Sequence, residues 1–168
     1  SAHFPGRSIF DPKRFGELRL KVGDVIRWND FPYPKEGEIK PRWFIYLGRS
    51  SNITHPIFLY FCTTTTQLQY FNAGGNRAHH TLKRFDVRQF SIFEENCILD
   101  YEEGIYDNLT EDKFIKCEAN IEMKGSLDSD TMRNIYKQYL KSDICSRKIL
   151  IDLHESFNQD GITGLKRP

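Results

Sequence analysis

Two uninterrupted apolar runs constrain the fold of this chain more than any other feature of its sequence. Residues 43–47 and residues 57–62 consist of hydrophobic and aromatic side chains only, and a polar segment with Gly48 and Asn52 separates them. Runs of this length between turn-forming residues are typical of strands at the centre of a sheet. We therefore predict that both runs are central strands.

Shorter segments predict further strands, about five to seven in all, in an antiparallel sheet. A first strand is expected at residues 22–28. The turn-forming residues 72–76 lie between residues 68–71 and residues 81–85, which indicates a long hairpin. Other short strands are expected at residues 90–93, 97–101 and 121–123.

The last third of the chain changes from a strand-like to a helical pattern. Residues 108–111 carry the side chains of a capping box, which predicts a short helix that ends at Lys116. A cap at Asp128 or Ser129 precedes apolar residues at helical spacing, and Ser142 can cap a second helix. Short strands followed by covering helices predict a mainly β fold, a small antiparallel barrel with C-terminal helices.

Length and composition indicate one domain. A chain of 168 residues with 39% hydrophobic content can bury one sizeable core but is short for two. We expect an N-terminal arm at residues 1–21, a single domain at residues 22–162 and a tail at residues 163–168. No long apolar run and no leader pattern is present, so a cytoplasmic protein without a membrane segment is expected.

The four cysteines are predicted to be structural. Cys62, Cys97, Cys117 and Cys145 lie far apart and form no C-x-x-C pair of the kind found in zinc sites and redox motifs. Cys62 and Cys97 have apolar neighbours, where a free cysteine behaves as a small buried hydrophobe. We expect both to be buried and unbridged, and we expect no metal and no cofactor.

Charge is distributed unevenly although the formal net charge is only +1. Basic residues dominate the first part of the chain and residues 77–88, whereas acidic residues dominate residues 94–130. Such a surface could hold a phosphate backbone on one side and repel it from the other. The plain alternative is an ordinary solvated surface.

Several short motifs follow one another in a fixed order along the first part of the chain. Residues 22–26 read Val-Gly-Asp-Val-Ile, and a loop with Phe31 and Pro32 follows. Lys40-Pro41-Arg42 then leads into the first apolar run, and Cys62-Thr63-Thr64 ends the second. This order resembles that of the MazF/PemK family of RNA-cleaving toxins, over about residues 22–140 and most closely as far as Thr64.

The resemblance implies a fold, an activity and two catalytic residues. The fold would be an SH3-like (PemK-like) barrel, usually a homodimer, that acts as the toxin of a toxin–antitoxin system with a cognate antitoxin. The activity would be metal-independent cleavage of single-stranded RNA by Arg42 and Thr63. Attack by a ribose 2′-hydroxyl on its own phosphodiester places negative charge on the phosphoryl oxygens, which a guanidinium fork and a hydroxyl donor can meet.

Other residues are candidates for contacts around this pair. The expected RNA-binding residues are Lys40, Thr64, Tyr33, Arg77, His80, Lys83 and Arg84, and the expected supporting residues are Glu38 and Asp100. Each also has a plain interpretation. Arg42 could be a surface arginine at a strand start, the threonines of residues 63–66 could reflect β-propensity alone, and histidines of this kind are mostly surface residues.

Two further functions stay open at this level. The chain could be a non-catalytic SH3-like module that binds RNA or a protein partner, or an interaction domain whose acidic half docks a basic partner. Small barrels host many functions, so the fold does not choose among them.

Overall fold

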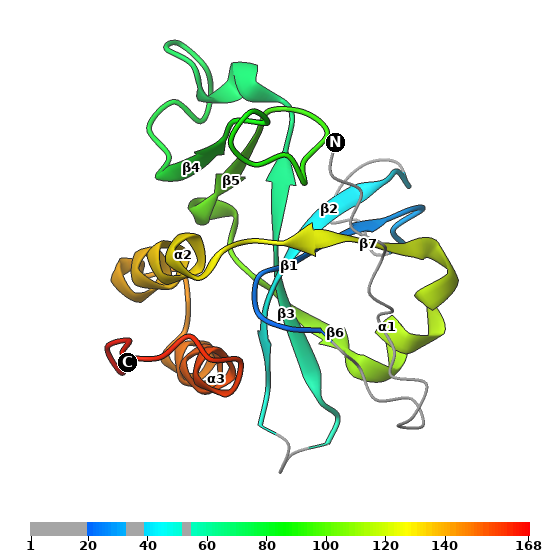
Figure 1. Cartoon of the computed structure of the whole chain (residues 1–168). Helices are drawn as coiled ribbons and strands as arrows, with labels where there is room; N and C mark the ends of the chain where they lie inside the picture. Colours follow the sequence, from blue (N-terminus) through cyan, green and yellow to red (C-terminus); the bar gives the residue numbers. More distant parts are fainter. Residues whose placement is uncertain (1–19, 33–38, 52–54) are drawn as a thin grey trace.

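The sheet is organised around β3 (Phe58–Thr65), the strand with three partners. A computed structural model of the chain describes residues 20–32, 39–51 and 55–168 (Figure 1). β2 (Arg42–Arg49) pairs with β3 along one edge. On the other edge, the first half of β3 pairs with β6 (Tyr106–Thr110) and its last residues pair with β5 (Cys97–Asp100). The C-terminal end of β3 therefore leaves the main sheet to join a smaller one.

The remaining strands complete an antiparallel sheet in the order β4-β5-β3-β2-β1-β7, with β6 off this path. They are β1 (Asp24–Trp28), β4 (Leu82–Phe85) and β7 (Ile121–Ser126). The mainly β class and the C-terminal helices are confirmed. The sheet formed by the described strands is not closed, because β4 and β7 stand at opposite ends of the order.

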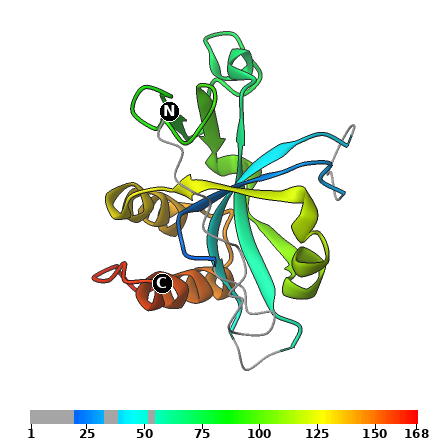
Figure 2. The same ribbon diagram turned by 45° about the vertical axis from the view of Figure 1, so that its right-hand side comes forward.

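Both faces of the central strands are buried, which explains why their sequences are continuously apolar. Side chains alternate between faces along a strand. Ile45 and Cys62 face α2 (Ser129–Lys141) and α3 (Arg147–Gln159). Phe44 and Phe61 face the other way, in the cluster that includes Phe114 of α1 (Glu111–Lys116). Figure 2 shows α2 and α3 on one side of the sheet and α1 on the other.

The helix boundaries agree with the sequence except at two caps. Asp128 caps α2 as expected, with its carboxylate 2.8 Å from the backbone nitrogen of Thr131. Thr110, the last residue of β6, caps α1 in place of Asn108, because Asn108 still belongs to the strand. Ser146 caps α3 in place of Ser142, whose hydroxyl instead accepts a hydrogen bond from the backbone nitrogen of Ile144.

The predicted long hairpin between residues 68–71 and 81–85 is wrong. The first segment is a short 3₁₀ helix (η1, Leu68–Phe71), and β4 pairs with β5 instead. At Gly75 a Cβ atom would lie 2.5 Å from the carbonyl oxygen of Tyr70, so this glycine lets the loop fold back on η1. The backbone nitrogen of Arg77 then donates to the same carbonyl at 2.7 Å.

Smaller differences concern the strand limits. The first strand begins at Asp24, after a turn at residues 22–23, and residues 90–93 form turns rather than a strand. β6 was not predicted. The tail packs on the domain: Leu165 is buried, and the hydroxyl of Tyr136 donates to the carbonyl of Lys166 at 2.6 Å.

Cys62 and Cys97 are buried, as expected, and both thiols are free. Burial raises the pKa of Cys62 to about 12 and that of Cys97 to about 11, so both stay protonated at neutral pH. Within the described ranges, every helix is too short or too polar to cross a lipid bilayer.

Candidate functional site

A cleft of about 520 Å³ lies where β3 leaves the main sheet. Its walls include Lys40 just before β2 and Arg42 at the start of β2. Residues 63–66, at and just after the end of β3, and Arg77, from the loop after η1, also line it. Glu103 and Tyr106 contribute from the segment that joins β5 to β6 and from β6 itself. The volume falls in the range of roughly 300–1,000 Å³ that is usual for ligand sites.

Arg42 and Thr63, the two residues expected to be catalytic, line this cleft together. Phe44 pairs directly with Thr63 across β2 and β3, and Arg42 precedes Phe44 by two residues. Arg42 and Thr63 therefore point to the same face as diagonal cross-strand neighbours. Diagonal neighbours are about 7–8 Å apart, a distance that an arginine side chain can cover.

Tyr106 is a cleft residue that sequence reasoning missed. Its ring lies 5.6 Å from that of Phe44, on the face that also carries Arg42. Burial raises the pKa of the Tyr106 hydroxyl, and the positive charge of Arg42 acts against this rise. The phenol is thus a neutral donor beside the guanidinium. Ile105, Tyr106, Leu109 and Thr110 suit a strand, but the capping-box pattern of residues 108–111 predicted the start of a helix there.

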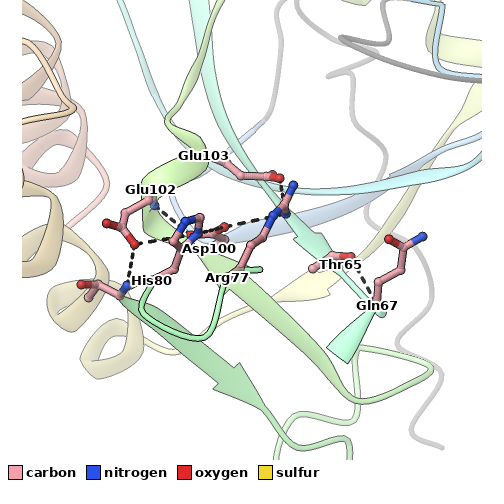
Figure 3. Close-up of polar contacts among 8 residues, drawn as sticks. Thr65, Gln67, Arg77, His80, Asp100, Glu102 and Glu103 are labelled. Atoms are coloured by element: carbon pink, nitrogen blue, oxygen red, sulfur yellow. Dashed lines mark hydrogen bonds and ion pairs between the residues drawn. The ribbon is translucent and has the colours of Figure 1, made fainter. Parts of the chain in front are cut away.

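Arg77 is held at the cleft by two carboxylates (Figure 3). Its Nη1 atom lies 2.6 Å from Oε1 of Glu103 and 3.8 Å from Oδ2 of Asp100. The guanidinium also lies over the ring of Phe71, 5.9 Å from its centroid. These contacts fix a long side chain that would otherwise be free to move, and they present a second arginine to the cleft.

His80 and Asp100 are not among the residues that line the cleft, although Asp100 contacts Arg77, which does line it. The Nδ1 atom of His80 is 2.8 Å from Oδ2 of Asp100, whose side chain is only 2% exposed. Asp100, expected to support the site, therefore contacts Arg77 and His80. The backbone nitrogen of Glu102 donates to its other oxygen, Oδ1, at 3.0 Å.

The other expected RNA-binding residues fall in different places. Lys40 and Thr64 line the cleft. Lys83 lies outside it, 5.4 Å from the ring centroid of Phe85, and Arg84 is exposed on the same strand, β4. Tyr33 and Glu38 lie outside the described residues.

The expected separation of acidic from basic surface does not hold at the cleft. Glu94, Glu95 and Glu103 line it together with the basic residues. Glu94 is 3.2 Å from the ammonium of Lys124, and Glu103 pairs with Arg77. These pairs offset part of the negative charge that would face an RNA backbone.

Comparison with protein-family models, curated proteins and solved structures finds no match to this chain. The function proposed for this chain therefore rests on the geometry of the cleft.

Proposed function

We propose that the protein is a metal-independent endoribonuclease that cleaves single-stranded RNA as the toxin of a toxin–antitoxin system. The observation that carries the proposal is the placement of Arg42 and Thr63 on one face of the β2–β3 pair, inside one cleft. An arginine and a hydroxyl side by side are donors suited to a phosphodiester that gains negative charge during reaction.

The proposed reaction is an attack by the ribose 2′-hydroxyl on the adjacent phosphorus. A bond forms between the 2′-oxygen and phosphorus, and the bond from phosphorus to the 5′-oxygen breaks. The 2′-hydroxyl loses its proton and the leaving 5′-oxygen gains one, so the products are a 2′,3′-cyclic phosphate and a 5′-hydroxyl. Arg42 stabilises the charge on the non-bridging oxygens, and Thr63 donates a further hydrogen bond.

Neighbouring groups bind the flanking backbone in this proposal. Arg77 and Lys40 supply positive charge on the cleft walls, and Thr64 supplies a hydroxyl. The neutral phenol of Tyr106 can donate to a phosphoryl or sugar oxygen next to Arg42. Contacts to phosphate and sugar fix the position of the strand without selecting its sequence.

The proposal includes the architecture that the sequence resemblance implies. An SH3-like barrel opened at one side is compatible with β3, which pairs with β6 at one end and β5 at the other. The same proposal includes a homodimer, a cognate antitoxin that binds it, and a cytoplasmic location.

A non-catalytic module is the second candidate, and the acidic residues of the cleft favour it. Glu94 and Glu95 line the cleft beside Arg42 and Thr63, so a protein segment with basic side chains would also find partners there. Cleavage itself separates the two functions, since a binding module leaves RNA intact.

The test is incubation of the whole chain with a long single-stranded RNA in excess chelator, followed by mapping of the product ends. We expect cuts that leave a 2′,3′-cyclic phosphate and a 5′-hydroxyl. RNA that is bound but stays intact would replace the endoribonuclease with the binding module. Cleavage that chelator abolishes would contradict the metal-independent reaction.

A further inference from the structure

We propose that His80, Asp100 and Glu102 form a binding site for a borderline divalent cation such as Zn²⁺, next to the cleft but separate from it. Nδ1 of His80 lies 2.8 Å from Oδ2 of Asp100 and 3.8 Å from Oε2 of Glu102. All three donor atoms lie within 4.8 Å of one another (Figure 3). One imidazole and two carboxylates are a donor set that Zn²⁺ accepts, with a remaining position for water.

The distances are close to those that a bound ion requires. Zinc binds histidine nitrogen and carboxylate oxygen at about 2.0–2.2 Å, so donor atoms in a tetrahedral site lie about 3.3 Å apart. The contact between His80 and Asp100 would open by about half an ångström, and that between His80 and Glu102 would shorten by as much. The oxygens of Asp100 and Glu102, which lie within 4.8 Å of each other, would also have to approach. Rotation of the Glu102 side chain, which is 36% exposed, is the movement that would bring them together.

The backbone fixes where the three ligands stand. Asp100 pairs with Leu82 across β5 and β4, and the backbone nitrogen of Tyr101 donates to the carbonyl of Thr81 at 3.1 Å. His80 and Glu102 therefore extend from the joined ends of these strands. Asp100 stands on β5 itself, His80 lies two residues before β4, and Glu102 lies in the 3₁₀ turn Tyr101–Glu103 that follows β5. The pairing of β4 with β5 therefore keeps the three ligands close together.

Hydrogen bonds from backbone nitrogens orient both carboxylates. Glu102 donates through its backbone nitrogen to Oδ1 of Asp100, which leaves Oδ2 directed at His80. Thr81 donates through its backbone nitrogen to Oε2 of Glu102 at 2.8 Å. Partners of this kind set the direction of ligand side chains in metal sites.

Exposure allows a cation to reach the site. The side chain of Asp100 is 2% exposed, whereas those of His80 and Glu102 are 21% and 36% exposed. One ligand is thus buried at the base, and the other two stand at the surface. The nearly buried carboxylate supplies the negative charge that attracts a cation.

Arg77 acts against cation binding and makes the inference testable. Its Nη1 atom lies 3.8 Å from Oδ2 of Asp100, although Glu103 holds it more closely at 2.6 Å. A positive charge at that distance repels a divalent ion. Removal of Arg77 should therefore strengthen cation binding, whereas removal of His80 should weaken it.

A bound ion would tie the end of the loop that carries Arg77 to β5. The loop begins at η1 and ends at His80, so the ion would fix its C-terminal end beside the cleft. The ion would order a wall of the cleft and would take no part in the cleavage step, so cleavage in excess chelator should persist when the ion is removed.

The experiment is a titration of tag-free, metal-stripped whole chain with Zn²⁺ by calorimetry, repeated with Co²⁺ and read by visible absorption. The parent should bind one ion per chain. His80→Ala and Glu102→Gln should each weaken binding at least tenfold, and Arg77→Ala should tighten it. His79→Ala is the matched control, because His79 is the exposed neighbour of His80 and should leave binding unchanged.

Two outcomes would overturn the site. The first is a parent chain that takes up no stoichiometric ion. The second is a His80→Ala or Glu102→Gln variant that melts like the parent and binds the ion as tightly. No RNA is present in this assay, so its result is independent of the endoribonuclease proposal.

Discussion

Thr63 and Arg42 supply two different kinds of donor to the cleft. The threonine hydroxyl is a single neutral donor on a strand, and its place is set by the pairing of Phe44 with Thr63. The guanidinium is a charged fork at the start of the neighbouring strand. The proposed reaction needs both, because charge develops on phosphoryl oxygens that one donor cannot cover.

Thr63→Val should lower the cleavage rate about a hundredfold while the fold is kept. The loss of one donor aimed at developing charge typically has an effect of this size, and valine preserves the shape and β-propensity of threonine. Single-turnover cleavage in chelator measures the rate. Thr163→Val, at an exposed position outside the cleft, is the control, and a Thr63→Val rate equal to that of this control would remove Thr63 from the site.

At the residue scale, part of the site could be predicted from the sequence. Arg42 and Thr63 each adjoin an apolar run, so their places at strand ends follow from local pattern. Tyr106 and Glu103 could not be found in this way. They reach the cleft only because β6 pairs with β3, a contact between distant parts of the chain that no local pattern encodes.

β2 and α3 approach each other closely at Gly48. The residue has φ +146°, and a Cβ atom there would lie 2.6 Å from the Cβ of Ser156. The Ser156 hydroxyl also accepts a hydrogen bond from the backbone nitrogen of Arg49 at 3.0 Å. Glycine at this position therefore allows the helix to cover the sheet.

Gly48→Ala should destabilise the protein by about 2–4 kcal/mol, from overpacking together with backbone strain. Chemical denaturation measures the change. Gly74→Ala is the control, because Gly74 also has a positive φ but no atom lies within 4 Å of its Cβ position. Equal losses in the two variants would show that contact with α3 is not the cause.

Asp128→Ala should destabilise α2 by about 1 kcal/mol at neutral pH, as the loss of a helix cap usually does. The backbone nitrogen of Thr131 lowers the pKa of Asp128 below its ordinary 3.8. The carboxylate therefore stabilises the fold above that value, and this stabilisation fades as the pH falls through the lowered pKa.

Melting curves of Asp128→Ala and the parent should consequently converge in acid. Asp130→Ala is the control, because Asp130 lies in the same first turn without being the capping residue. A difference between Asp128→Ala and the parent that grows as the pH falls would contradict the cap assignment.

Strands and helices were predicted correctly where a single local pattern, such as an apolar run or a helix cap, specified them. Both central strands, the cap at Asp128 and the α2 helix follow from runs and spacing in the sequence. The long hairpin failed because turn-forming residues indicate where a chain reverses but not which strand it then joins. β4 pairs with β5, and residues 86–96 connect the two strands.

At the scale of the whole molecule, charge decides how RNA would be held. Lys40, Arg42 and Arg77 line the cleft, and carboxylates lie among them.

Whether the sheet closes into a barrel could not be predicted from the sequence, since strand order at the ends of a sheet depends on contacts between distant segments. The described strands form an open sheet whose two edge strands are β4 and β7.

RNA affinity should fall steeply with added salt. Each phosphate contact by an arginine or lysine contributes to the slope of log K against log salt, about 0.7 per contact on single strands. Arg42→Ala and Arg77→Ala should each lower the slope by about 0.7, the contribution of one phosphate contact. Arg147→Ala, at the exposed start of α3, should leave the slope unchanged. Binding that is independent of salt would contradict a phosphate-binding cleft.

The most direct test of the central claim is cleavage of single-stranded RNA in chelator by the parent, Arg42→Ala and Arg42→Lys, with a thermal melt of each. Arg42→Ala should lose activity at least a hundredfold, and Arg42→Lys should recover little, because an ammonium cannot make the planar two-pronged contact. All three should melt at similar temperatures. A parent that never cuts, or an Arg42→Ala variant that cuts at the parental rate, would contradict the endoribonuclease assignment.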